Sequence, residues 1–234
     1  MSGFPDRSHK LSVTASGLAS AAVAAAFAGP GIRSIGQIAE GAPGSLVQTG
    51  PFGSQLHASD YVSEGVPTFM PTDIANGRLD IAGAAKITES KANELGRHRL
   101  RSGDLLFGRR GDLSRCAVVP DGAAGGLCGT GCLLVRIPNN VIAADWLALV
   151  YRHDYVQRQV LGRAVGSTML NLSGGLIRSL LVPLPTEESE QLMAAFRSNE
   201  QRLEAESNQH SKLRELRRGL ASDLLSGRVR TVKA

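Results

Sequence analysis

The spacing of apolar and polar positions divides the chain into a strand-rich body and a long helical arm. Between residues 33 and 138, short apolar runs are separated by clusters of Gly, Pro, Asn and Asp, such as Gly50-Pro51-Phe52-Gly53 and Asn76-Gly77. This spacing is typical of short strands joined by tight turns. The predicted strands cover residues 68–70, 104–108, 116–119, 132–137 and 180–185.

Two helices are predicted within the body. Residues 88–95 form a short helix that Thr88 can cap, because a threonine side chain accepts a hydrogen bond from the first helical turn. Residues 143–161 are predicted as one helix that packs on the sheet. The apolar side chains that recur there at three-to-four-residue spacing are Trp146, Leu147, Val150, Tyr151, Tyr155 and Val156.

The arm is predicted from an uninterrupted helical pattern between residues 190 and 225. Alternating steps of four and three residues mark one row along this helix, whose polar members indicate a narrow, partly hydrated seam that fixes register. At about 1.5 Å per residue the helix extends roughly 50 Å, beyond the radius of so small a domain. One face therefore needs another copy or another subunit, unless the helix folds back along its own domain. The row consists of Leu192, Phe196, Asn199, Leu203, Glu206, His210, Leu213, Arg217, Leu220 and Leu224.

Composition adds a bias toward acidic partners. The 234 residues are 42% hydrophobic and 20% charged, which suits one ordinary domain plus extensions. The net charge of +5 favours nucleic acid as the commonest acidic partner, although the excess is mild. The three cysteines are an odd number in a chain too large to need disulfides, so we expect reduced thiols in the cytoplasm.

The N-terminal region has an Ala-rich run at residues 18–28, before Gly29-Pro30-Gly31. It resembles a secretion signal superficially, but Ser, Thr and Gly interrupt it and strongly apolar residues are scarce. An Ala-rich helix or a loosely ordered tail is the favoured interpretation over secretion. Since no stretch approaches the roughly 20 apolar residues that a span requires, we expect no membrane segment.

Catalytic and cofactor motifs are not recognisable in the sequence. The glycines at 126, 129 and 131 lack the strand, helix and acidic partner of a dinucleotide site. Cys128 and Cys132 have no nearby histidine to complete a zinc site, so buried thiols are the default expectation. Ser, His and Asp occur without a nucleophile elbow. We therefore expect no enzyme, cofactor or metal.

A series of short motifs resembles, in order, the specificity subunits of type I restriction-modification systems. Residues 49–57 (TGPFGSQLH), 60–62 (DYV), 65–67 (GVP) and 71–74 (PTDI) resemble the opening of a target recognition domain. The strand and Arg-Gly turn of that domain resemble residues 103–111 (GDLLFGRRG), and its late loop resembles residues 166–168 (GST) and 171–173 (NLS). Residues 181–185 (LVPLP) with Glu190-Gln191 resemble the entry to the family's long spacer helix. Residues 213–218 (LRELRR) and 224–229 (LLSGRV) resemble the end of that helix.

This resemblance implies an α+β fold with a strand-rich target recognition domain and a long C-terminal coiled-coil spacer helix. Full specificity subunits alternate two recognition domains with two spacers, whereas this chain resembles a half-length form with one of each. The predicted segments are an Ala-rich tail or helix (1–32), which has no counterpart in the family, the recognition domain (33–186), the spacer helix (187–226) and a C-terminal tail (227–234).

The implied partners are double-stranded DNA and DNA methyltransferase (M) subunits, with restriction (R) subunits left open. Two copies pairing their helices antiparallel would read a palindromic bipartite site, one half-site per domain. A different class of function, a protein-interaction scaffold that uses the arm without reading DNA, also remains open. An enzymatic fragment of a methyltransferase ranks third.

The candidate DNA contacts lie on predicted loops and carry the side chains that bind phosphates or base edges. Arg109 and Arg110 are the strongest pair, because they flank Gly111 at a strand end; a solvated turn or salt bridges to Asp104 and Asp112 are equally compatible with the sequence. For Gln55, His57 and Lys86 a plain surface role is favoured over base contact. The full set is Ser54, Gln55, His57, Lys86, Arg97, His98, Arg99, Arg101, Arg109, Arg110, Arg115, Thr168 and Asn171.

Overall fold

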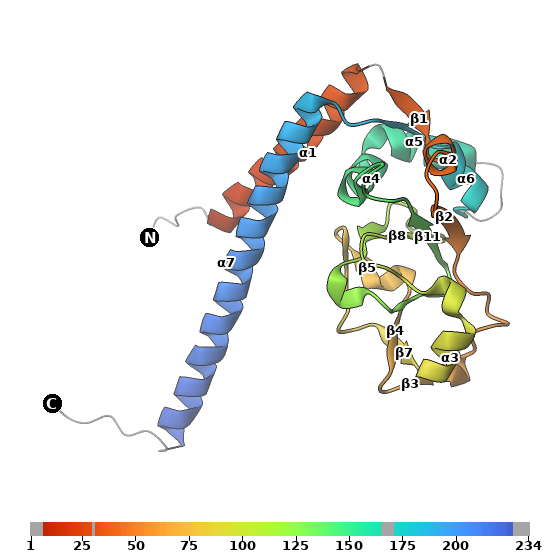
Figure 1. Cartoon of the computed structure of the whole chain (residues 1–234). Coiled ribbons are helices and arrows are strands. Elements are labelled where there is room, and N and C mark those ends of the chain that lie inside the picture. The colour runs from red at the N-terminus through yellow and green to blue at the C-terminus, as the bar shows by residue number, and fades with distance from the viewer. Residues whose placement is uncertain (1–6, 30, 165–170, 227–234) are drawn as a thin grey trace. The chain divides into compact units, whose positions relative to one another are not determined.

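The computed structural model describes residues 7–29, 31–164 and 171–226, and the chain divides into two compact units. The body is Val23–Thr186, and the second unit combines Met1–Ala22 with Glu187–Ala234. Figure 1 shows the short strands of the body and the long C-terminal helix. The expected α+β class with a long C-terminal helix is confirmed. The role of residues 33–186 as a recognition domain stays a prediction.

The central sheet of the body has the strand order β2 (Leu46–Thr49), β11 (Cys132–Arg136), β8 (Leu105–Gly108) and β9 (Cys116–Val118), all antiparallel. In the register, Leu134 lies opposite both Gln48 and Leu106. Cys132 to Val135 are all buried, as are all four residues of β8. These strands are continuous apolar runs because both faces are covered, and the sequence pattern identified them for that reason.

The second sheet has the order β10 (Leu127–Cys128), β4 (Val66–Phe69), β7 (Ala85–Ile87) and β3 (Tyr61–Val62), with only the β10–β4 pair parallel. Its apolar side includes Ile87 and Leu127, which pack with Ala92 of α3 (Glu89–Glu94). Thr88 caps α3, because its side chain accepts a hydrogen bond from the backbone of Lys91 at 3.2 Å. The predicted cap is confirmed.

A two-residue hairpin joins β5 (Ile74–Ala75) to β6 (Arg78–Leu79). Its turn residues, Asn76 and Gly77, have φ angles of 51° and 76°. Asn and Gly tolerate this left-handed conformation, and such a turn matches the twist of the flanking strands. The sequence predicted the turn, but not two strands as short as these.

The helical prediction for residues 143–161 is wrong in one respect. Two helices, α4 (Ala144–Arg152) and α5 (Asp154–Ala164), are separated by His153, whose backbone is extended at φ −72° and ψ 142°. Trp146, at the start of α4, is buried and donates its indole hydrogen to the Pro183 carbonyl at 3.0 Å. Tyr155, just after the break, is 40% exposed, and its ring contacts that of Phe27 in a tilted arrangement at a centroid distance of 4.6 Å.

The chain enters and leaves the body side by side, because β1 (Ile32–Ser34) pairs antiparallel with β12 (Leu181–Pro183). Ser34 then caps α2 (Ile35–Glu40), and Ser173 caps α6 (Gly174–Ser179). The described part of the body also contains four single-turn 3₁₀ helices: η1 (Ala58–Asp60), η2 (Pro71–Asp73), η3 (Gly96–His98) and η4 (Asp121–Ala123).

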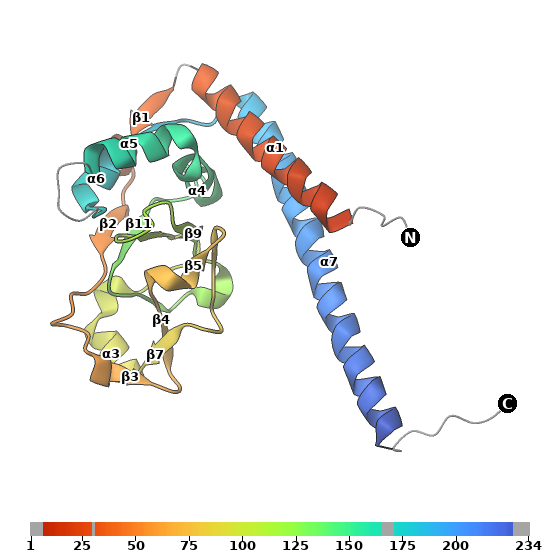
Figure 2. The same ribbon diagram turned by 180° about the vertical axis from the view of Figure 1, so that it is seen from behind.

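The second unit contains α7 (Glu187–Leu225) and residues 7–22 of α1 (Arg7–Ala28), and Figure 2 shows both helices from behind. The Ala-rich region is therefore a helix. Ala19, Ala22, Val23 and Ala26 are buried at the three-and-four spacing of one helical face. None of the described helices combines the length and apolar character of a bilayer span.

The two halves of α7 differ in burial along the predicted row. In the first half Asn199 is buried, and Leu192, Phe196 and Leu203 are partly buried. From His210 onward every member of the row is exposed. The helix begins three residues earlier than the sequence pattern predicted, where glutamates in the first turn complement the helix dipole.

Candidate nucleic-acid interface

The arginine turn after β8 is joined to a distant loop by backbone hydrogen bonds. The Arg109 carbonyl accepts from the Leu172 amide at 2.9 Å, and the Arg109 side chain returns a hydrogen bond from Nε to the Leu172 carbonyl at 3.0 Å. Arg110 forms a β-bridge with Asn171. Three predicted contact residues from two separate motifs therefore share one surface. Thr168, predicted with Asn171, lies outside the described residues.

The strand topology gathers further loops at the same end of the central sheet. The end of β2, the end of β8 and the start of β11 lie together, since Thr49 and Phe107 both pair with Leu133. Beyond the strands, the Gly50 amide donates to the Cys132 carbonyl at 2.9 Å, and the Arg109 amide donates to the Gly131 carbonyl at 2.8 Å. The sheet end thus carries the loops at 50–57, 109–115 and 129–131, together with the bridged segment at 171–173.

The two arginines of the turn have different environments. Arg110 is exposed, whereas Arg109 is partly buried. Burial, followed by the charge of Arg110, lowers the pKa of Arg109 below its ordinary value, but an arginine stays charged at neutral pH. The carboxylates of the salt-bridge alternative have other partners, because Asp104 pairs with Arg136 at 2.6 Å and Asp112 with Arg115 at 3.5 Å.

The rest of the turn loop is fixed to the body from two sides. The Tyr151 hydroxyl of α4 donates to the Leu113 carbonyl at 2.5 Å, and burial raises the pKa of Tyr151 so that the proton is retained. Arg115 donates from Nη1 to the carbonyls of Pro71 at 3.0 Å and Ile74 at 3.1 Å. The guanidinium of Arg115 therefore holds the hairpin region against the loop, and its DNA contact stays a prediction.

Arg97 lies beside a buried histidine. The Arg97 Nε donates to His98 Nε2 at 3.0 Å, and the Gln48 amide lies 3.0 Å from His98 Nδ1. Burial, together with the charge of Arg97, lowers the pKa of His98 to about 4. His98 is therefore neutral at physiological pH and buried, and it positions the exposed Arg97.

The remaining predicted contacts are spread over other loops and strands. Arg99 is occupied internally, since its guanidinium bonds Glu89 at 2.5 Å, Asn93 at 2.9 Å and the Gly125 carbonyl at 2.6 Å. The Gln55 side-chain oxygen accepts from the Phe52 amide at 3.2 Å and closes the loop. Side chains on the surface of the body are Ser54, His57 and Arg101, which are exposed, and Lys86, which is half-buried on β7.

Two features of this end were not recognised from the sequence. The glycine-rich loop at 129–131 was considered only as a cofactor motif, yet its backbone connects β2 to the arginine turn. Gly50 approaches the Gly129 carbonyl so closely that any side chain would collide with it. Arg152, at the end of α4, reaches the neighbouring hairpin. A basic residue in the last turn of a helix was its only local signal.

The three cysteines of the chain lie in the interior of the body. Cys116, Cys128 and Cys132 are free, buried thiols, as the sequence predicted, and burial raises the pKa of Cys116 to about 12. Within the described part of the chain, no cluster of His, Cys, Asp and Glu could hold a metal ion.

Comparison with known proteins identifies the class of fold. No protein-family model matches the chain, and no curated protein matches it. Solved structures do: the HsdS subunit of Thermoanaerobacter tengcongensis aligns with a TM-score of 0.53 and 18% identity over 93% of this chain and 52% of that one. The specificity subunit of the type I restriction-modification system of M. genitalium aligns with a TM-score of 0.55 and 15% identity, over 92% and 55%.

A third structure concerns complex assembly and conformational transition of a type I restriction-modification system, and aligns with a TM-score of 0.51 and 17% identity over 83% of this chain and 46% of that one. The chain thus spans about half the length of the structures that it matches. Its fold is that of a type I specificity subunit, as the ordered motifs implied.

Proposed function

We propose that this chain is a sequence-specific DNA-recognition subunit of a type I-like restriction-modification complex in the cytoplasm. The observation that carries the proposal is the convergence of separate loops, with Arg109, Arg110 and Asn171, at one end of the central sheet. Loops on a rigid scaffold are the usual carriers of binding residues, and exposed arginines bind phosphates and guanine edges. The specificity-subunit fold supports the same function.

The role of α7 in this proposal is to pair with a second copy. The seam positions from His210 onward are exposed in one copy, including Leu213, Leu220 and Leu224. An antiparallel homodimer would cover them and present two body units to one duplex, so a palindromic bipartite site is expected. Methyltransferase subunits supply the catalysis, and restriction subunits join in complexes that cleave DNA; the chain itself is non-catalytic.

The competing function is a protein-interaction scaffold, favoured by the same exposed leucines because they require a partner but not DNA. A binding titration separates the two. Wild-type protein should bind random-sequence duplex DNA with a steep salt dependence, and more tightly when the methyltransferase subunit is present. Absence of binding at every salt concentration, with the partner added, would support the scaffold instead.

The arginine turn provides the site-specific test. Arg110→Gln should weaken binding to the cognate site by about 1–3 kcal/mol if the guanidinium reads a base edge, and should leave random-sequence binding less affected. Arg158→Gln is the matched control, since Arg158 is also an exposed arginine but lies on α5. Equal binding by wild type and Arg110→Gln on both kinds of DNA would exclude the turn from recognition.

Sequencing of methylated sites in cells that carry the chain and its methyltransferase tests the pairing. A twofold-symmetric bipartite motif is expected. An asymmetric motif would mean that a different recognition chain supplies the second half-site, and the homodimer would be excluded.

A further inference from the structure

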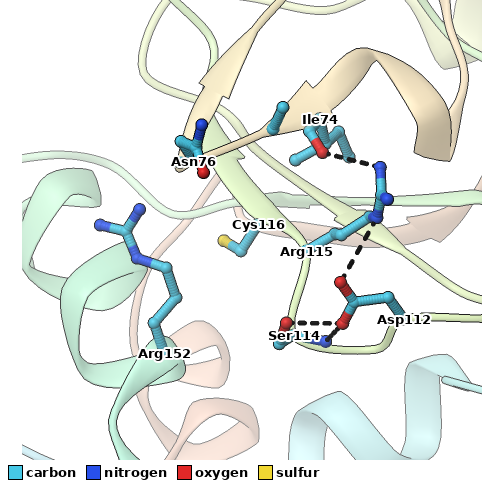
Figure 3. A pocket seen from close by; sticks show the side chains of 9 residues that line it. Ile74, Asn76, Asp112, Ser114, Arg115, Cys116 and Arg152 are labelled. Atoms are coloured by element: carbon cyan, nitrogen blue, oxygen red, sulfur yellow. Dashed lines mark hydrogen bonds and ion pairs between the residues drawn. The ribbon is translucent and has the colours of Figure 1, made fainter.

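A pocket of about 510 Å³ opens beside the arginine turn. Its walls come from three elements of the body: the β5–β6 hairpin, the second half of the 109–115 loop with Cys116, and the end of α4 (Figure 3). The side chains that matter for its chemistry are Asn76, Asp112, Ser114, Arg115 and Arg152. Because one wall continues the arginine turn, whatever binds that turn passes close to the pocket.

Arg152 is the charged group on the α4 side of this pocket (Figure 3). Its guanidinium rests on the turn of the hairpin, where Gly77 leaves room for it, and a Cβ at that position would collide with the Arg152 side chain. Among the residues that the structure describes, Arg152 makes no hydrogen bond or ion pair. The hairpin thus holds an uncompensated guanidinium at the pocket.

On the opposite wall of the pocket, the charged side chains Asp112 and Arg115 already have partners. The Ser114 amide and hydroxyl donate to Asp112 at 3.0 Å and 2.6 Å, and these hydrogen bonds lower the pKa of that carboxyl. Arg115 pairs with Asp112 at 3.5 Å and donates to the Ile74 carbonyl at 3.1 Å. Two arginines against one aspartate leave one positive charge in the lining, and Arg152 carries it.

We propose that this pocket binds a phosphate of the DNA backbone, with Arg152 as the charged ligand and the Asn76 amide beside it. This inference rests on the proposed DNA-recognition function. A guanidinium without a partner matches the two oxygens of a phosphate, and phosphate contacts set the position of a protein on the duplex. The loop between the pocket and the arginine turn is held by Tyr151, which is next to Arg152 in sequence. The phosphate contact and the base contacts would therefore be made from one anchored loop and the helix that holds it.

The test uses the full chain and fluorescence anisotropy on two unrelated random-sequence duplexes across a salt series. Arg152→Gln should weaken binding equally on both duplexes, and should reduce the slope of log affinity against log salt by about 0.9, the value for one lost phosphate contact. Arg152→Lys keeps the charge and should restore the slope. Arg158→Gln, the exposed arginine on α5, should reproduce the wild-type slope.

A merely structural role gives a different result. Arg152 also occupies the last turn of α4, where a positive charge stabilises a helix. If Arg152→Gln lowers the melting temperature but keeps the wild-type salt slope, the phosphate site is refuted.

A second arm replaces DNA by inorganic phosphate against chloride at matched ionic strength. Phosphate should raise the melting temperature of wild type and not of Arg152→Gln. If wild type binds phosphate in this way but no DNA, the proposed DNA-recognition function fails and the occupant is a free anion. If wild type binds DNA with a slope that Arg152→Gln leaves unchanged, only the pocket assignment fails.

Discussion

Replacing Leu213 and Leu220 by alanine should dissociate the proposed dimer without unfolding its helix. These leucines lie seven residues apart on α7 and are 55% and 58% exposed in the single chain. Leu216 and Leu224, on the same side of the helix, are 61% and 42% exposed. Four large apolar side chains at helical spacing on an otherwise polar segment indicate a surface that a partner helix covers.

The magnitude follows from the area that remains to be buried. Fully burying a leucine contributes about 1.5–3 kcal/mol, and roughly half of each side chain is still exposed, so pairing gains about 1 kcal/mol per leucine. Two leucines in each of two copies give about 4 kcal/mol, which corresponds to a dissociation constant raised about 10³-fold. Alanine has the highest helix propensity, so the change should preserve the helix.

Sedimentation equilibrium over a concentration series measures this dissociation constant, and circular dichroism verifies the helix. The control is Val141→Ala with Leu161→Ala, because these residues are 44% and 48% exposed but lie in the body. The control should dimerise like wild type. The reasoning is refuted if wild type stays monomeric at every concentration, or if the α7 variant pairs as tightly as the control.

Three further predictions concern the body. Burial keeps His98 neutral by lowering its pKa from 6.5 to about 4, so the unfolded chain takes up a proton first. The free energy of unfolding should therefore be highest above about pH 6.5 and fall by about 3 kcal/mol as the pH drops toward 4. Urea titrations at several pH values should show this fall in the free energy of unfolding for wild type and not for His98→Asn. An equal fall in both proteins would contradict the assignment to His98. Asp104→Asn leaves the partly buried Arg136 without its carboxylate and should cost about 3–5 kcal/mol by denaturant titration, whereas a loss below about 1 kcal/mol would mean that the pair is solvated. Tyr151→Phe removes the donor to the Leu113 carbonyl and should cost about 1–3 kcal/mol, with weaker DNA binding under conditions where the variant is fully folded; unchanged stability would show that the hydroxyl does not hold the loop.

The variants at Arg110, Arg152 and Tyr151 all test the same loop, which carries the arginine turn and lines the pocket. Leu113 lies between the arginine turn and the pocket that contains Arg152, and Tyr151 ties it to α4. A variant that loosens this tie should affect both ends of the loop. Recognition by this body would therefore depend on a packed helix behind the loop as well as on the exposed arginines.

Features with local causes could be predicted from the amino-acid sequence. Thr88 caps α3 because its hydroxyl reaches an amide three residues away, and Asn76-Gly77 forms a hairpin turn because both residues accept positive φ. The long α7 is equally local, since a continuous helical pattern without Pro fixes it over 39 residues. The buried strands of the central sheet were identified because whole runs of their residues are apolar.

Which of the candidate side chains lie together depends on contacts between segments that are distant in the sequence. Arg110 meets Asn171 through a bridge that spans sixty-one residues, and Arg99 and Arg115 are held by internal partners that no local pattern specifies. The strands of two or three residues exist because neighbours supply their hydrogen bonds, not because of their own propensity. Elements and motifs thus followed from the sequence, whereas long-range pairing fixed which arginines stay exposed, because hydrogen bonds and ion pairs form between segments that only the fold brings together.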